Sequence, residues 1–160
     1  MSEALPPVTS LYNRQILGEA VKLARWPLRS NLAVGAEKRS KTCGSVVHIG
    51  LNIDDQARIT EIGLQVHACA LGQASAAIVA QNIIGSDEAH LRQSLQALRQ
   101  FLEGNEAASP PWSAYEMLAA ARRYPARHAS IMLPLEVALI ALENARSSNS
   151  TLQEEKTNGC

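Results

Sequence analysis

Two stretches of alternating apolar and polar residues predict an antiparallel β-hairpin in the first half of the chain. The apolar positions are Val47, Ile49, Leu51 and Ile53 in the first stretch and Ile62, Leu64 and Val66 in the second. The polar residues 54–57, Asp-Asp-Gln-Ala, lie between the two stretches and are typical of a turn. Alternation with a period of two directs one face of each strand into the core and the other into solvent.

Helical periodicity precedes the hairpin. One stripe of a helix contains Tyr12, Ile16, Ala20 and Leu23. Thr9 or Ser10 is suited to cap the start of this helix, and Pro27 is expected to end it. Between the helix and the hairpin, residues 32–34 indicate a short edge strand, which leads to the mostly basic residues 37–41.

Four further helices are predicted after the hairpin, over residues 69–84, 87–102, 112–123 and 130–145. Gly85 and Gly104 end the first two, and Tyr124-Pro125 ends the third. The complete pattern is an N-terminal helix, a small antiparallel sheet of two to three strands, and about four helices packed on one face of the sheet. This order defines an α+β fold.

The length of 160 residues fits one domain, which we expect over residues 9–145. The Pro-containing residues 1–8 are expected to form a flexible lead. Residues 146–160 are rich in Ser, Asn, Thr, Glu and Lys, a composition that predicts a disordered tail. Cys160 ends this tail, and no fixed role is assigned to it.

The charge balance and the hydropathy exclude several classes of partner. The chain has 15 Lys and Arg residues and 15 Asp and Glu residues, so it lacks the basic stripe of a nucleic-acid-binding protein. There is no uninterrupted run of about 18 apolar residues and no signal-peptide pattern, so we expect no membrane association. The expected location is cytoplasmic, where the cysteines at positions 43, 69 and 160 are free, metal-bound or reactive rather than paired.

Cys69 stands at the corner where the second alternating stretch ends and a helix begins. The corner spans residues 66–76, Val-His-Ala-Cys-Ala-Leu-Gly-Gln-Ala-Ser-Ala. A thiol at a helix N-terminus faces unpaired backbone N–H groups, which stabilise the thiolate that binds metals and accepts sulfur. The alternative is a buried structural cysteine that packs as a small apolar side chain.

The pairing of the two strands brings a second cysteine to the same place. Cys43 lies about 12 residues before the turn and Cys69 about 12 residues after it, so antiparallel pairing places both at one end of the sheet. His128, near the start of the last helix, is a third residue of a metal-ligating type. Two thiolates and an imidazole suit zinc or an iron–sulfur cluster, but they leave one of the usual four positions unfilled.

Three short sequences and the order of the elements resemble those of a known family. The sequences are Cys43-Gly44-Ser45, Ala-Cys-Ala-Leu-Gly-Gln-Ala-Ser at residues 68–75, and Arg-His-Ala-Ser-Ile at residues 127–131. Over roughly residues 9–145, the chain resembles the NifU/IscU/SufU family of iron–sulfur cluster assembly scaffolds. The resemblance implies a NifU/IscU-like fold and a site for iron or an iron–sulfur cluster.

In that family, the first cysteine lies in a Cys-Gly-Asp turn, the second begins a helix rich in Ala and Ser, and the third follows a His or Lys. The resemblance implies that Cys43 and Cys69 match the first two cysteines and that His128 precedes the third position. Ser45 stands in place of the family aspartate, and Ala129 stands in place of the third cysteine. What the resemblance carries over is therefore a partial site of Cys43, Cys69 and His128.

His67 is a candidate substitute ligand for this partial site. It lies two residues before Cys69, where the predicted strand ends. The alternative is an exposed or hydrogen-bonded strand residue, because the parity of the strand directs His67 away from the buried face.

Three functions are compatible with the partial site. The first, which we favour, is a scaffold that binds iron or a labile iron–sulfur cluster for transfer to other proteins. The second is a zinc-binding or metal-free accessory protein that docks a cysteine desulfurase, and the third is a sulfur acceptor that carries a persulfide on Cys69 or Cys43. The resemblance implies cysteine desulfurase and iron–sulfur recipient proteins as partners, and a second copy of the chain, as a homodimer, could complete the coordination. No Gly-rich phosphate loop, paired carboxylates or Ser-His-Asp arrangement indicates a conventional enzyme.

Overall fold

The structure, a computed structural model, describes residues 11–105 and 107–157. The α-helices are α1 (Arg14–Val21), α2 (Ala70–Asn82), α3 (Glu88–Leu102) and α4 (His128–Thr157), and the strands are β1 (Val34–Arg39), β2 (Val46–Ile53) and β3 (Ile59–His67). The 3₁₀ helices are η2 (Lys22–Arg25), η3 (Ser113–Arg123) and η4 (Pro125–Arg127). The expected α+β order, an N-terminal helix, a small antiparallel sheet and then helices, is confirmed.

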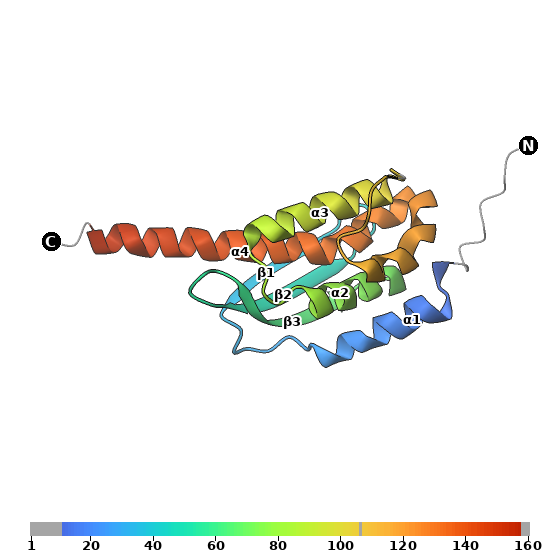
Figure 1. The fold of residues 1–160 in the computed structure, drawn as a ribbon. Coiled ribbons are helices and arrows are strands. Elements are labelled where there is room, and N and C mark those ends of the chain that lie inside the picture. Colours follow the sequence, from blue (N-terminus) through green and yellow to red (C-terminus); the bar gives the residue numbers. More distant parts are fainter. Residues whose placement is uncertain (1–10, 106, 158–160) are drawn as a thin grey trace, which may run out of the picture.

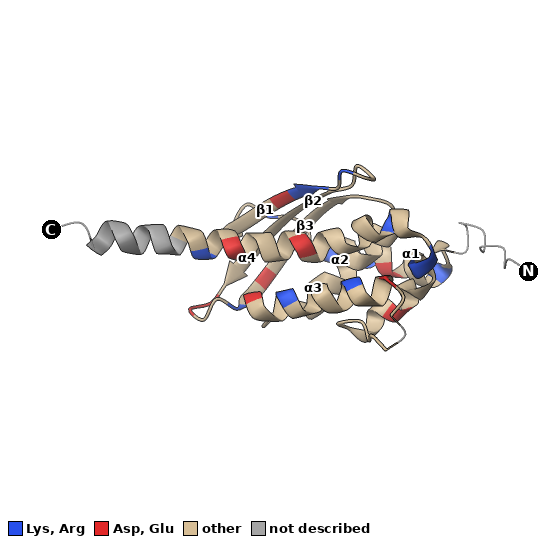
Figure 2. Ribbon diagram, turned by 90° about the horizontal axis from the view of Figure 1, so that it is seen from above, with Lys and Arg blue, Asp and Glu red and all other residues tan. Residues whose placement is uncertain are grey.

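The sheet is antiparallel, with the strand order β1-β2-β3. Val46 pairs with His67 at one end of the β2–β3 hairpin, and Leu51 pairs with Ile62 near the turn. Figures 1 and 2 show that α2, α3 and α4 lie together on one face of the sheet. The alternation of apolar residues predicted this arrangement, because a strand with one apolar face needs helices on that side only.

The centre of the opposite sheet face is covered by the chain that links η2 to β1. Gly50 and Gly63 pair with each other there. A Cβ atom on Gly63 would lie 2.6 Å from the carbonyl oxygen of Pro27, so a larger residue would push the linking chain away from the sheet. The N–H of Leu64 donates to the carbonyl oxygen of Trp26 at 2.8 Å and fixes the same chain against the edge of β3.

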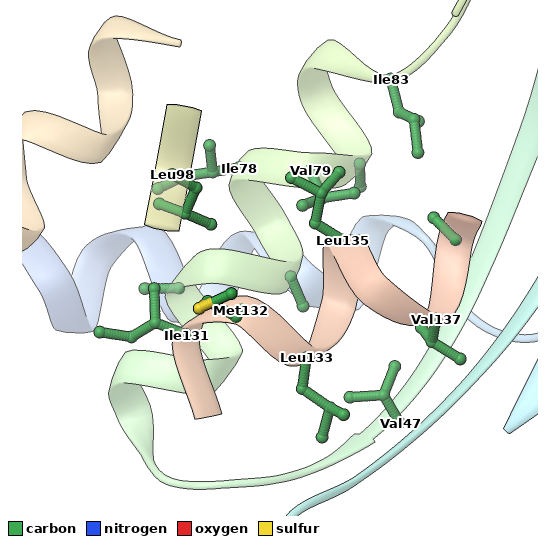
Figure 3. Close-up of a cluster of buried hydrophobic side chains, with 14 of the residues drawn as sticks. Val47, Ile78, Val79, Ile83, Leu98, Ile131, Met132, Leu133, Leu135 and Val137 are labelled. Atoms are coloured by element: carbon green, nitrogen blue, oxygen red, sulfur yellow. The ribbon is translucent and has the colours of Figure 1, made fainter. Parts of the chain in front are cut away.

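The core lies between α2, α4 and β2. Figure 3 shows Ile78 and Val79 of α2 in one buried cluster with Val47 of β2 and with Leu135 and Val137 of α4. Each of these side chains is at most 1% exposed. This packing holds the middle of α2 and α4 against each other and against β2.

α4 is longer than the sequence indicated. The predicted helix end at Ala145 is corrected to Thr157, and residues 146–157, which were expected to be disordered, are helical. No Gly or Pro interrupts this stretch. The hydroxyls of Ser147 and Ser148 also donate to carbonyl oxygens one turn earlier, so the polar composition of the stretch does not end the helix.

One helical segment, Pro125–Ser148, which comprises η4 and the first part of α4, is long and apolar enough to cross a membrane by length and composition alone. This finding differs from the expectation drawn from the sequence, which shows no uninterrupted apolar run. Within the protein, 56% of the 18-residue apolar stretch of this segment is buried, and α4 packs against α2, α3 and β1. This packing is that of a core helix.

α1 begins later than the sequence indicated. Asn13 caps it, and the side chain of Asn13 accepts a hydrogen bond from the N–H of Ile16 at 2.9 Å. The predicted caps, Thr9 and Ser10, lie outside the described residues, as do the expected flexible lead and residues 158–160.

Candidate functional site

The two cysteines of the predicted site lie at the same end of the hairpin. β2 begins three residues after Cys43, and β3 ends two residues before Cys69. The Cys43 thiol donates to Ser45 Oγ at 3.2 Å, and Ser45 Oγ lies 3.3 Å from Ser130 Oγ. Ser130 Oγ in turn lies 3.7 Å from Cys69 Sγ. Two buried serines therefore connect the two thiols.

Cys43 lies in the tight turn between β1 and β2. The N–H of Ser40 donates to the carbonyl oxygen of Ser45 at 2.8 Å, and the N–H of Gly44 donates to the carbonyl oxygen of Ser40 at 3.0 Å. Gly44 has a φ of 72°, a left-handed conformation that glycine adopts without strain. The turn therefore holds Cys43 at the surface, where its side chain is exposed.

Cys69 is the N-cap residue of α2 and has an extended backbone, with φ −66° and ψ 170°. Its thiol faces the first N–H groups of the helix, because the N-cap side chain points at them. Three residues later, a Cβ atom on Gly72 would lie 2.5 Å from Ser130 Oγ. The absence of a side chain at Gly72 is therefore what allows the start of α4 to approach Cys69.

Hydrogen bonds favour the charged form of Cys69. Burial alone would raise the pKa of the Cys69 thiol, but hydrogen bonds outweigh burial and lower this pKa. The donors are the N–H groups of Gly72 and Leu71 and the hydroxyls of Ser130 and Tyr12. A larger fraction of Cys69 is therefore the thiolate near neutral pH than for an ordinary thiol, and the thiolate is the reactive and metal-binding form.

Burial and hydrogen bonds also have opposite effects on the pKa of the Cys43 thiol. Burial would raise the pKa of its thiol, but hydrogen bonds from the hydroxyls of Ser40 and Ser45 and from nearby backbone N–H groups lower it. Tyr12 responds in the opposite direction, since burial and the neighbouring charge of Cys69 raise the pKa of the Tyr12 hydroxyl. The site is therefore built to hold negative charge on sulfur and not on the tyrosine.

The two predicted histidine ligands are not brought to the cysteines. His128 is half-buried at the first turn of α4, and its Nε2 donates to the carbonyl oxygen of Ala121 at 2.9 Å. His67 is exposed at the end of β3, on the side of the sheet that the strand parity predicted. Across residues 11–105 and 107–157, no three His, Cys, Asp or Glu side chains are placed so that they could hold a metal ion together.

Ser130 and Tyr12 are site residues that the sequence did not single out. Ser130 is 1% exposed and lies between the two thiols, although the sequence separates it from Ser45 by 85 residues. Its position two residues after His128, in a segment that resembles a known site, was the available signal. Tyr12 was assigned only to the apolar stripe of the first helix, and nothing local indicated that its hydroxyl reaches Cys69.

A groove of about 420 Å³ lies beside the loop that carries Cys43. Its lining includes the basic residues Lys38, Arg39 and Lys41, the hydroxyl residues Ser40 and Thr42, and Ala129 at the start of α4. Lys38 is paired with Glu136 of α4. Glu136 also lines the groove, and the methyl group of Ala129 offers no donor atom to a metal, so this side of the site is mostly cationic.

No family model matches the sequence, and no curated protein matches it. A solved structure, the N-terminal part of a nitrogen-fixing NifU-like protein from Brucella abortus, is 32% identical over 88% of this chain and 97% of its own, with a TM-score of 0.76. A second structure, from Fervidobacterium islandicum AW-1, is described as a candidate iron–sulfur cluster assembly scaffold protein for the SUF system. It is 22% identical over 84% of this chain and 98% of its own, with a TM-score of 0.74, and this likeness shows the fold. A third, a hypothetical protein, shares the fold at 17% identity and a TM-score of 0.68, over 82% of this chain and 98% of its own.

Proposed function

We propose that this chain is a scaffold that holds iron or a labile iron–sulfur cluster at Cys43 and Cys69 and transfers it to other proteins. The basis of the proposal is that the chain belongs to the NifU/IscU/SufU-type family. The observation that supports this proposal is the pair of thiols joined by Ser45 and Ser130 at one end of the sheet. Iron binds thiolates, and a structure that lowers the pKa of both thiols increases the fraction of each that is the thiolate.

Within residues 11–105 and 107–157, Cys43 and Cys69 supply two of the four ligands that such a cargo usually takes. The hydroxyls of Ser45 and Ser130 are weaker ligands than a carboxylate or thiolate, and they are already hydrogen-bonded to the site. His128 stays a predicted third ligand, and its ring would have to leave the carbonyl oxygen of Ala121 or use its other nitrogen. His67 also stays a prediction. A site with few fixed ligands suits a carrier, because its cargo is released more easily than from four thiolates.

The residues around the thiols hold the charge in place. The N–H groups of Leu71 and Gly72 and the hydroxyl of Ser130 keep the Cys69 thiolate oriented before any cargo arrives. The tight turn at Gly44 does the same for Cys43, and this thiol is the more exposed of the two. Cargo would therefore enter and leave on the side of Cys43.

A second function is favoured by the exposure of Cys43. The chain would then be a zinc-binding or metal-free accessory protein that docks a cysteine desulfurase and accepts sulfur. In that step, the thiolate attacks the outer sulfur of the persulfide on the desulfurase, a new S–S bond forms, the old S–S bond breaks, and the desulfurase cysteine leaves as a thiolate. The lowered pKa of the Cys43 thiol suits this reaction. The cytoplasmic location and the recipient proteins stay predictions.

The test is the metal and sulfide content of the protein purified without oxygen and then supplied with iron and sulfide. We expect bound iron and acid-labile sulfide in the parent protein, and a loss of both in Cys43→Ala and in Cys69→Ala. Cys160→Ala is the matched control and should keep its cargo. Zinc alone, unchanged by a supply of iron and sulfide, would favour the second function, and absence of iron, sulfide and zinc would refute the scaffold proposal.

A further inference from the structure

The groove beside the Cys43 loop borders the cysteine site on two sides. Thr42, which lines the groove, is the residue before Cys43, and the Cys43 thiol is exposed. Ala129, which also lines the groove, is the residue before Ser130, and Ser130 Oγ lies 3.7 Å from Cys69 Sγ. A molecule that occupies the groove would therefore lie within reach of the exposed thiol.

The lining of the groove is suited to a small anion. The side chains of Arg39 and Lys41 make no ion pair within the part of the chain that the structure describes. The hydroxyls of Ser40 and Thr42, whose oxygens lie 3.1 Å apart, belong to the same loop. Figure 2 shows the positive charges on β1 and on the loop that follows it. Arginine and lysine side chains bind carboxylates and phosphates through charge-assisted hydrogen bonds, so these free cations favour a ligand with such groups.

The other residues of the lining do not oppose an anion. Glu136 is the one carboxylate among the lining residues, and it is ion-paired with Lys38, so its charge is compensated. Ala129 and Leu133 are apolar. The volume of about 420 Å³ lies within the range of about 300–1,000 Å³ that is typical of small-molecule sites. The groove therefore fits a small molecule with anionic groups and a short uncharged stem.

The cysteine site lacks a group that such a molecule can carry. Across residues 11–105 and 107–157, no His, Cys, Asp or Glu side chain joins Cys43 and Cys69 as a third ligand. Iron–sulfur cargo is held mainly by thiolates, so a third thiolate is the ligand that the site most needs. Among small anions, one that carries a thiol in addition to carboxylates matches both the groove and the thiols beside it.

We propose that the groove binds a small thiol that carries carboxylates, with these carboxylates on Arg39 and Lys41, and that its sulfur supplies a third thiolate to the cargo at Cys43 and Cys69. This inference rests on the proposed function, because it concerns the same cargo. The small thiol binds by coordination: it loses its proton to solvent, no S–S bond forms, and nothing is oxidised or reduced. The cargo is then held by three thiolates while the small thiol is bound and by two after it leaves.

The first measurement is the binding of glutathione, a tripeptide thiol with two carboxylates, to the metal-free full chain without oxygen. The backbone NMR signals of residues 40–42 and of Ala129 should shift during the titration. S-methylglutathione keeps both carboxylates but has no free thiol, and it should shift the same signals with a similar affinity. Cysteine, which carries one carboxylate, is a second source of the same chemistry, and it should bind more weakly because it can occupy only one of the two cations.

The charges of the groove are tested by substitution. Arg39→Gln together with Lys41→Gln should weaken the binding of glutathione about 10-fold, because the charge-assisted hydrogen bonds to its carboxylates are lost. Arg25→Gln together with Arg58→Gln is the matched control. It removes the same charge at two positions that do not line the groove, and it should bind glutathione as the parent does.

The second measurement repeats the titration on the chain loaded with one equivalent of Cd²⁺, an ion that prefers thiolates. Coordination by the added sulfur should raise the affinity for glutathione about 10-fold over that of the metal-free chain, and it should leave the affinity for S-methylglutathione unchanged. Native mass spectrometry should show one chain, one ion and one glutathione in the complex.

Four results would overturn the inference. They are the absence of shifts in the groove signals with glutathione, equal binding of glutathione by Arg39→Gln, Lys41→Gln and the parent, removal of Cd²⁺ by glutathione without a ternary complex, and binding of 2-mercaptoethanol, which has no carboxylate, as tightly as glutathione. Each of them leaves the proposed function intact if the parent holds iron and sulfide. If the parent holds neither iron nor sulfide but binds glutathione in the groove, the proposed function fails and only the anion site remains.

Discussion

The middle of α2 and α4 differs in character from the N-terminal ends of the same two helices. In the middle, Ile78 and Leu135 belong to an apolar cluster that is fully buried. At the N-terminal ends, Cys69 and Ser130 belong to a chain of hydrogen bonds that reaches the surface at Cys43. In α2 and α4, the middle turns therefore form the hydrophobic core, and the first turns contribute residues of the cysteine site.

This difference suggests that stability and cargo binding can be changed separately. Burial of apolar side chains provides most of the free energy of folding, whereas polar side chains near the surface contribute little to it. Substitutions in the middle of the helices should therefore unfold the protein without changing the site. Substitutions at the N-terminal ends should change the site and have smaller effects on stability.

The largest expected effect is on stability, from Leu135→Ala. The Leu135 side chain is fully buried, and its removal leaves a cavity, so we expect a loss of about 2–5 kcal/mol in the free energy of unfolding. Urea unfolding followed by circular dichroism measures this loss. The fraction that stays folded should bind as much iron per chain as the parent. Weaker binding by the folded fraction would show that the core also sets the geometry of the site.

Gly72→Ala should affect both regions, because Gly72 lies at their junction. The new Cβ would lie 2.5 Å from Ser130 Oγ and 2.7 Å from the Cβ of Ala68, so we expect a loss of about 1–3 kcal/mol in stability together with weaker cargo binding. Gly18→Ala in α1 is the matched control. A Cβ at Gly18 meets nothing within 4 Å, so this change should raise stability by about 0.5–1 kcal/mol. Equal effects of the two substitutions on unfolding would contradict the close approach of α4 to Cys69.

Ser130→Ala should change the site more than the stability. Removing the hydroxyl breaks the link between Ser45 and Cys69, with an expected loss of about 1 kcal/mol in stability. Cargo affinity should fall by about 10-fold, as for other residues that orient ligands. Ser148→Ala on the same helix, where the hydroxyl donates to the carbonyl oxygen of Asn144, is the control for both measurements. If the two variants bind iron equally well, Ser130 does not position the thiols.

The smallest expected effect is the pH dependence of stability. Hydrogen bonds lower the pKa of Cys43 and Cys69 in the folded protein, so the unfolded chain binds more protons over the interval between these lowered values and about 8.5. Stability from this source is fully present above about pH 8.5 and is lost as the pH falls through the lowered pKa values. Urea unfolding of the parent should therefore show stability rising with pH in this interval, more steeply than in the Cys43→Ala, Cys69→Ala double variant. Parallel curves would contradict the lowered pKa values.

The parts of the site that sequence analysis predicted are those that depend on local patterns. Alternation predicted the two strands of the hairpin. Cys43 and Cys69 are about equally far from the turn, so antiparallel pairing of the strands predicted that they lie at the same end of the sheet. The role of Ser130 depends instead on how the start of α4 packs against α2. Ser130 and Cys69 are separated by 61 residues in the sequence, and no local pattern predicts their contact. The orientation of His128 toward Ala121 has the same origin. Residues 146–157 have a polar composition that predicts disorder, but they contain no Gly or Pro, and they continue α4.

The claim that Cys43 and Cys69 together hold the cargo can be tested by alkylation of the protein after loading with iron and sulfide. Iodoacetamide is added without oxygen to the loaded and to the metal-free protein, and modification of each cysteine is measured by mass spectrometry of its peptides. We expect Cys43 and Cys69 to be protected together in the loaded protein and modified in the metal-free protein, with Cys160 modified in both. Modification of Cys43 or Cys69 while iron and sulfide remain bound would contradict the account.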